Sequence, residues 1–213
     1  MFVLGVTGSL GAGKTMVSEM FGNRGAVIFN ADEVVHGLLE TNGPVIKAVA
    51  KTFGQAVMSS GGINRKELSR IVFDDSGEMK KLTDILFPLA RKKAESFVEK
   101  HQRRKLLVLD VPLLIEAGWD DLVDKVVVVR ASRAQQMERV LKRSGLKKSE
   151  VLKRIKYQMP LREKQKYADY VIDNRGSKSD TDKQVQRIVK ELDEQCSEGF
   201  ETLSVKKLTG RSL

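Results

Sequence analysis

The chain has 213 residues, of which 41% are hydrophobic and 31% are charged, and its formal net charge at pH 7 is +10. This length suits one domain with a full core, and the ordinary composition excludes a disordered chain. No apolar run approaches the roughly 20 residues of a membrane helix, so we expect a cytoplasmic protein without a membrane partner. The positive charge indicates an affinity for anions, whether nucleic acid, an acidic membrane or phosphorylated small molecules.

Five short apolar runs separated by longer helical patterns predict a parallel sheet with helices on both faces. The predicted strands are 2–6, 26–29, 106–111, 125–129 and 169–172. Residues 33–105 hold no convincing strand, and the spacing of Leu82, Ile85, Leu86 and Leu89 predicts a helical insertion. A last helix is predicted from Val185, Ile188, Val189 and Leu192. Residues 196–213 show no clear period and are expected to be a mobile tail, with Cys196 as an incidental thiol.

Residues 8–15, GSLGAGKT, match the phosphate-binding pattern G-x-x-x-x-G-K-[ST] between a predicted strand and a helical pattern. Glycines let backbone N–H groups approach a phosphate chain, and the start of the helix adds its positive dipole end. We therefore expect Lys14 to reach the outer phosphates of a nucleoside triphosphate and the Thr15 hydroxyl to bind Mg²⁺. A glycine-rich turn with a surface lysine is the alternative, and the position between strand and helix disfavours it.

A guanine-nucleotide switch is disfavoured because the chain lacks the base-reading pattern N-K-x-D. Residues 74–77, DDSG, match D-x-x-G, but they follow a helical pattern instead of a core strand. A kinase acting on a small molecule therefore becomes the leading hypothesis.

The stretch NADEVVH, just after the second predicted strand, indicates where the molecule that accepts the phosphoryl group binds. Asn30 and Glu33 resemble a capping box, which puts Asp32 in the first turn of a helix at the carboxyl end of a strand. Asp32 could accept a proton from an attacking sugar hydroxyl or only stabilise the helix dipole, and spacing alone leaves both open. His36, one turn later on the same face, either contacts the acceptor or is structural.

Four stretches occur in the order GVTGSLGAGKT, NADEVVH, VLDVPLLIEAG and YADYVIDNRG. Together, across residues 1–190, they resemble the dephospho-CoA kinase family. The resemblance implies an α/β P-loop kinase with a five-stranded parallel sheet flanked by helices, a helical acceptor-binding insertion and a helical lid. It also implies ATP-dependent phosphorylation of the ribose 3′-hydroxyl of dephospho-CoA with Mg²⁺, the last step of coenzyme A biosynthesis. The implied parts are a core at 1–32, 106–138 and 168–195, the insertion at 33–105 and the lid at 139–167.

The resemblance and the residue patterns together assign the site. Predicted ATP ligands are Gly11, Ala12, Gly13, Lys14, Thr15, Met16, Arg139, Arg143 and Asn174. Predicted acceptor ligands are Asp32, His36, Pro88, Leu113 and Glu116, and the catalytic assignments are Asp32, Lys14 and Arg139. Three positions depart from the family pattern: Asn30 where aspartate is common, Met16 where threonine is usual, and Phe87 in place of a histidine.

Charged side chains elsewhere leave alternatives open. Asp110, at the end of the third strand, is either a Mg²⁺ ligand with Thr15 or a buried acid satisfied by backbone donors. Arg139 and Arg143 are four apart on one helical face, which suits a phosphate chain. Arg162 and Lys164 are candidate lid cations, although most lysines of this basic stretch are expected to lie in water.

Two further functions compete with this reading. One is a nucleoside or nucleotide kinase with a different acceptor, and the other is a basic nucleic-acid-binding ATPase. Aromatic residues make up only 6% of the chain, whereas single-strand binding relies on aromatic stacking. We therefore expect ATP and dephospho-CoA as partners and no nucleic acid, and the sequence predicts no oligomeric state.

Overall fold

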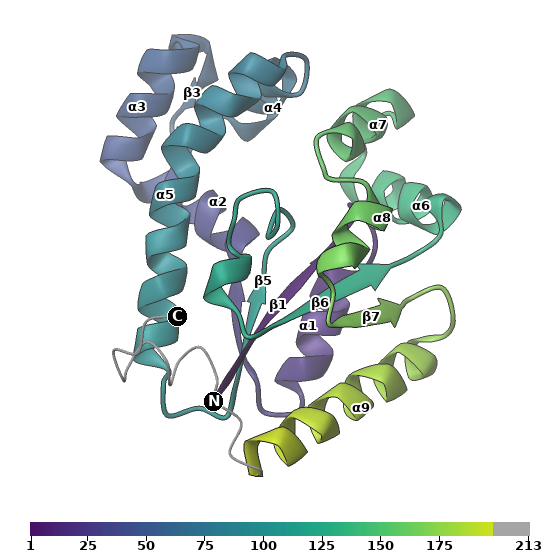
Figure 1. The fold of residues 1–213 in the computed structure, drawn as a ribbon. Coiled ribbons are helices and arrows are strands. Elements are labelled where there is room, and N and C mark those ends of the chain that lie inside the picture. The colour runs from purple at the N-terminus through teal and green to yellow at the C-terminus, as the bar shows by residue number, and fades with distance from the viewer. Residues whose placement is uncertain (198–213) are drawn as a thin grey trace. The chain divides into compact units, whose positions relative to one another are not determined.

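A computed structural model describes residues 1–197 of the chain (Figure 1). These residues form two compact units, one made of Met1–Asn30 and the chain from Glu95 onward, the other of Ala31–Ala94. Of the predicted tail, only Cys196 and Ser197 are described, and they belong to the last helix. The remainder of that tail lies outside the described residues.

A five-stranded parallel sheet forms the centre of the first unit. Its strands are β1 (Phe2–Gly8), β2 (Val27–Asn30), β5 (Leu106–Asp110), β6 (Lys125–Arg130) and β7 (Tyr170–Asp173). They lie in the order β2-β5-β1-β6-β7, and all neighbours are parallel. The five predicted strands are confirmed, and their ends shift by one or two residues.

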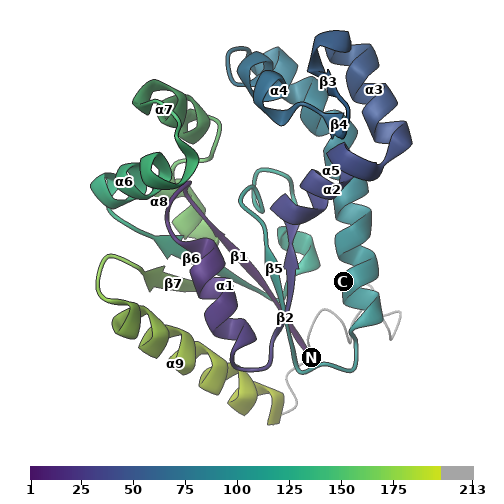
Figure 2. The ribbon, with the colours of Figure 1, turned by 180° about the vertical axis from the view of Figure 1, so that it is seen from behind.

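The core explains why these strands read as continuous apolar runs. Every residue of β1 and of β5 is buried, as expected for parallel strands covered on both faces. Two helices, α1 (Lys14–Gly22) and α9 (Lys178–Ser197), lie side by side over one face of the sheet (Figure 2). The core cluster contains Val17 and Phe21 of α1 together with Val185 and Ile188 of α9. The predicted apolar face of the last helix is therefore confirmed.

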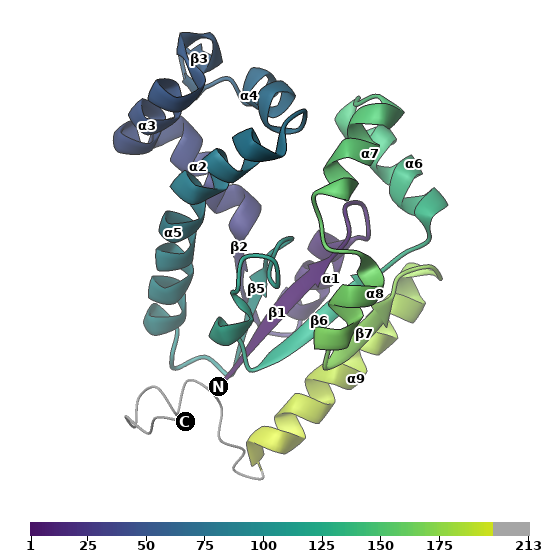
Figure 3. The same cartoon turned by 45° about the horizontal axis from the view of Figure 1, so that its top comes forward.

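The remaining helices of the first unit follow the strands β5 and β6. They are the 3₁₀ turn η2 (Asp120–Leu122), α6 (Arg133–Ser144), α7 (Lys148–Lys156), α8 (Leu161–Lys164) and the 3₁₀ turn η3 (Gln165–Tyr167). Figure 3 shows α6 and α7 as neighbours, after which the chain returns through α8 to β7. A capping box of Ser132 and Gln135 starts α6, and Gly145 in the left-handed region ends it.

The second unit is mainly helical. Its elements are α2 (Ala31–Thr41), α3 (Gly43–Phe53), the 3₁₀ turn η1 (Gln55–Val57), β3 (Met58–Ser59), β4 (Gly62–Ile63), α4 (Arg65–Val72) and the start of α5 (Ser76–Lys100). No strand is expected here from the sequence, but β3 and β4 form an antiparallel hairpin. Strands of two residues are too short to leave an alternating pattern. No helix of the described chain is both long and apolar enough to cross a membrane.

Candidate active site

Residues 8–15, hereafter the phosphate loop, join β1 to the start of α1. Gly11 (φ 76°) and Gly13 (φ 96°) adopt the left-handed conformation that favours glycine. A Cβ on Gly13 would collide with the side-chain amide of Asn174, and one on Gly11 would lie 2.6 Å from the Gln136 carbonyl oxygen. Both glycines are therefore required by backbone conformation and by their neighbours.

Side chains from distant segments hold this loop in place. The Asn174 Nδ2 donates to the Ala12 carbonyl at 2.7 Å, and Arg139 Nη1 donates to the same carbonyl at 3.4 Å. Arg139 Nη2 also donates to the Asn174 carbonyl at 3.3 Å, and Thr181 Oγ1 donates to Asn174 Oδ1 at 3.0 Å. The structure thus brings together Ala12, Arg139 and Asn174, and it adds Thr181, which no sequence signal marked.

Lys14 and Thr15 form the first residues of α1. The Lys14 ammonium donates to the Gly8 carbonyl at 3.3 Å, so its side chain folds back along the phosphate loop. Thr15 is exposed. The first amides of a helix have no acceptor within the helix, and they lie at the positive end of its dipole. This end of α1 can therefore bind an anion such as a phosphate chain.

Asp110 ends β5 beside β1, and it is 4% exposed. Its Oδ2 accepts a hydrogen bond of 3.0 Å from Ser18 Oγ, one turn after Thr15 on α1. Sequence reasoning missed Ser18, which the three-residue spacing from Thr15 could have indicated. The hydroxyl of Thr15 and the carboxylate of Asp110 are hard oxygen donors of the type that Mg²⁺ binds.

Among the described residues, no group of three or more His, Cys, Asp or Glu side chains could hold a metal ion. The hydroxyl of Thr15 and the carboxylate of Asp110 suit Mg²⁺ bound together with a phosphate chain, because that ion is usually held by one or two protein oxygens, waters and substrate phosphates.

An ion-pair cluster fixes the segment that carries Asn174. Asp173 Oδ2 lies 2.6 Å from Arg175 Nη2 and 2.9 Å from Arg130 Nη2. The hydrogen bonds from Arg175 and then Arg130 hold the pKa of the Asp173 carboxyl well below its usual range. Arg130 and Asp173 are also partners in the β6–β7 register, so the cluster ties the ends of two strands together.

The predicted acceptor residues of the second unit lie on two helices. Asp32 is in the first turn of α2, which begins directly after β2, as the capping pattern indicates. His36 Nε2 lies 2.7 Å from Glu40 Oε1 on the same helix. Pro88 is exposed inside α5. The roles of these three residues stay predictions.

Other predicted residues of the first unit have varied surroundings. Leu113 is half-buried after β5, and Met16 packs against the core cluster. Arg143 is exposed on α6, one turn after Arg139, and Arg162 is exposed on α8. Their contacts with substrates stay predictions.

Two predicted residues contact each other. Glu116 Oε1 lies 3.0 Å from Lys164 Nζ. Lys164 is therefore no exposed lid cation: its side chain is fully buried.

Comparison with known proteins identifies the family. The family model for dephospho-CoA kinase matches residues 2–180. The chain belongs to the dephospho-CoA kinase family. It is 40% identical over 190 residues to the dephospho-CoA kinase of Aquifex aeolicus, a match that covers 89% of this chain and 96% of the relative. The dephospho-CoA kinase of Symbiobacterium thermophilum is 42% identical over 189 residues, covering 87% and 79%.

Solved structures share the fold of this chain. A crystal structure of a Thermus thermophilus protein is 29% identical, with a TM-score of 0.75, and covers 90% of this chain and 97% of that one. Shikimate kinase from Acinetobacter baumannii has 15% identity and a TM-score of 0.51, covering 92% and 94%, which shows likeness of fold alone. The predicted P-loop kinase fold and the predicted family are confirmed, and this family catalyses the final step of coenzyme A biosynthesis.

The structure places the three residues that depart from the pattern of the dephospho-CoA kinase family. Asn30 ends β2 and faces Asp110 in the β2–β5 register. Met16 is partly buried beside the core, and Phe87 is half-buried in α5. Asn30 is thus an uncharged neighbour of a buried carboxylate, at the end of the strand that leads to Asp32.

Proposed function

We propose that this chain transfers the γ-phosphoryl group of ATP to the ribose 3′-hydroxyl of dephospho-CoA. The family match supports the reaction, and the phosphate loop supports the nucleotide side. The observation that carries the proposal is that Asn174 and Arg139 both donate hydrogen bonds to the Ala12 carbonyl of the phosphate loop. The same loop needs glycine at positions 11 and 13. A loop fixed in this way requires little rearrangement to accept phosphates.

The ATP phosphates would be bound by the amides of residues 11–16 and by the Lys14 ammonium. Arg139 lies against the loop through Ala12, and Arg143 follows one turn later on α6, so their guanidinium groups are the proposed counter-charges for the phosphate chain. Thr15 and Asp110 would hold Mg²⁺, which when bound neutralises charge on the phosphates.

Asp32 is the proposed general base. Its carboxylate would orient the ribose hydroxyl and take its proton as the hydroxyl oxygen attacks the γ-phosphorus in line with the leaving ADP. The uncharged Asn30 leaves Asp32 as the sole aspartate of the segment 30–32. His36, Pro88, Leu113 and Glu116 are the proposed contacts for the remainder of the acceptor.

An assay of ADP release tests the acceptor. Dephospho-CoA, nucleosides and nucleoside monophosphates are supplied in turn with Mg·ATP, and the position of the new phosphate is read by ³¹P NMR. We expect turnover with dephospho-CoA and a product phosphorylated at the ribose 3′ position. Strong turnover with a nucleoside monophosphate and none with dephospho-CoA would contradict the proposal. ATP hydrolysis stimulated by nucleic acid would favour the competing ATPase instead.

A further inference from the structure

Lys164, the last residue of α8, has a side chain with 0% exposure. Its ammonium donates to the Pro112 carbonyl at 2.6 Å and to Thr7 Oγ1 at 3.3 Å, and it lies 3.0 Å from Glu116 Oε1. A lysine ammonium has three donors, and here they meet three oxygens. Two come from the segment after β5 and one from β1, so Lys164 attaches α8 to the core sheet.

Burial makes this a costly place for a charge. Desolvation lowers the pKa of the Lys164 ammonium, Glu116 opposes that shift, and the neighbouring charge of Lys14 adds to it. The second carboxylate oxygen of Glu116 is buried and has no hydrogen-bond partner in the described part of the chain. A buried ion pair does not necessarily add to the net stability of the fold. Its effect on the positions of the segments that it joins is therefore the property of interest.

Further hydrogen bonds connect this ion pair to the phosphate loop. Glu116 Oε1 accepts a hydrogen bond of 2.8 Å from the Met159 amide, next to Gln158. Gln158 Oε1 in turn accepts a hydrogen bond of 2.7 Å from the Leu10 amide, in the phosphate loop. A chain of contacts thus starts at Thr7, which precedes the loop, and returns to the loop at Leu10.

We propose that Lys164 is a positioning residue for ATP binding: through Glu116 it places Gln158 against the Leu10 amide and so fixes the first half of the phosphate loop. Lys164 itself does not touch the nucleotide. The inference rests on the ATP part of the proposed function.

The test uses variants of the full-length chain, with ATP binding measured by titration calorimetry and thermal stability measured alongside. Lys164→Met alone removes the cation that faces the half-buried Glu116 carboxylate, so it is expected to fold poorly. The pair Lys164→Met with Glu116→Leu removes both charges at similar volume and is expected to fold. Gln158→Leu cuts the contact with Leu10 without burying a charge.

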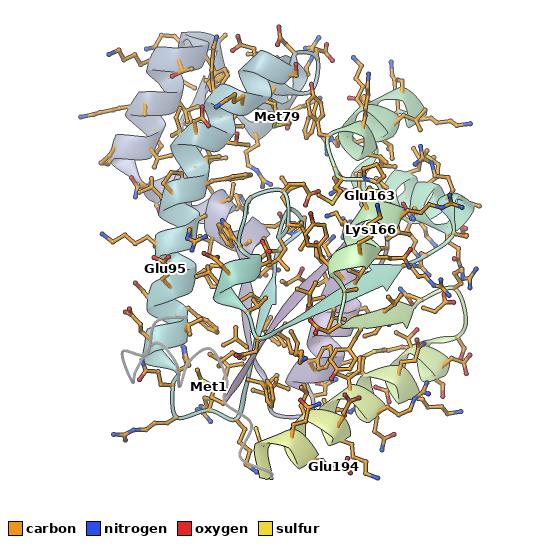
Figure 4. The ribbon with its side chains drawn as sticks, in the orientation of Figure 1. Met1, Met79, Glu95, Glu163, Lys166 and Glu194 are labelled. Atoms are coloured by element: carbon orange, nitrogen blue, oxygen red, sulfur yellow. The ribbon has the colours of Figure 1, made fainter. Side chains whose placement is uncertain are left out.

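A matched control is available two residues further along the chain. Lys166 forms an ion pair of 2.7 Å with Glu163, and both side chains are exposed; the two are labelled in Figure 4. Lys166→Met should leave the ATP dissociation constant within about twofold of the original protein, because exposed ion pairs contribute little.

The paired variant and Gln158→Leu should each weaken ATP binding about tenfold or more. Combined, they should weaken it little further, because both act through one contact. Normal ATP affinity in a folded paired variant, or additive effects in the combination, would overturn the inference. If the unsubstituted chain fails to bind ATP, the proposed function fails instead, so the two failures are distinguishable.

Discussion

The side-chain amide of Asn174, just beyond β7, donates a hydrogen bond of 2.7 Å to the carbonyl of Ala12 in the phosphate loop. Asn174 is 2% exposed, so water has little access to replace this bond. From the sequence, Asn174 is predicted to lie at the nucleotide site. The hydrogen bond indicates how it could act there, because it holds the Ala12 carbonyl of the phosphate loop in place. The same carbonyl accepts the longer bond from Arg139, which gives the loop a second support.

Asn174→Ala is expected to loosen the phosphate loop. The free energy of unfolding should fall by about 1 kcal/mol, because the Ala12 carbonyl keeps its bond from Arg139. ATP binding should weaken about tenfold, as measured by calorimetry. Thr181→Val, which removes only the hydroxyl that orients Asn174, should give a smaller loss of the same kind. Unchanged ATP affinity in both variants would show that the loop keeps its shape without this support.

Gly13→Ala should abolish ATP binding. Its φ of 96° disfavours a side chain, and the new Cβ would collide with Asn174. Gly25 has a similar φ of 91°, but a Cβ added there would meet nothing within 4 Å, so Gly25→Ala is a control for backbone strain alone. Both variants should lose about 1 kcal/mol or more of stability, and only Gly13→Ala should lose ATP binding. Equal loss of binding in the two would assign the effect to global destabilisation.

The roles of Asp110 and Ser18 can be distinguished by the Mg²⁺ concentration that variants at each position need for turnover. If Asp110 holds the ion, Asp110→Asn should raise the Mg²⁺ concentration for half-maximal turnover about tenfold or more, because a carboxylate charge is lost. Ser18→Ala removes only the hydrogen bond to Oδ2 and should leave that concentration nearly unchanged. Titration of activity with Mg²⁺ measures both. A normal Mg²⁺ requirement in Asp110→Asn would make this residue a structural acid.

Asp32→Asn tests the base. General-base catalysis contributes about 10² to 10⁴ in rate, so kcat should fall at least about 10²-fold. ATP binding should stay unchanged, since the proposed ATP ligands remain in place. A role limited to the helix dipole would instead cost under about 1 kcal/mol of stability and leave kcat intact. Measurement of kcat, ATP affinity and melting temperature on this one variant distinguishes the two.

Asp173 should contribute stability that depends on pH. Its pKa in the folded chain is lowered from the usual 3.8, so the unfolded chain binds the proton more tightly. The contribution is therefore complete above about pH 4 and is lost as pH falls through the folded value. Asp173→Asn should be less stable than the original chain at pH 7, and the difference should shrink below pH 3.8. Urea unfolding across this range measures it, and a stability difference that stays constant with pH would contradict the prediction.

Local patterns in the sequence determined much of the fold and part of the candidate site. The five apolar runs were sufficient to predict the parallel sheet, because buried parallel strands are apolar at consecutive positions. Gly8, Gly13, Lys14 and Thr15 marked the phosphate loop, because the pattern that they form occupies the consecutive positions 8–15. The position of Asp32 in the first turn of α2 was likewise a local property.

Tertiary structure alone decided which distant residues support the loop. Asn174 and Ala12 are 162 positions apart, and no periodicity links them. Lys164 lies in a strongly basic stretch, whose composition indicated either a lid cation or a solvated lysine, but the return of the chain through α8 buries the side chain against Glu116. The hairpin β3–β4 also escaped prediction, because two-residue strands carry no alternation. Hydrogen bonds between remote segments depend on where the strands end in space, and a one-dimensional pattern does not encode that.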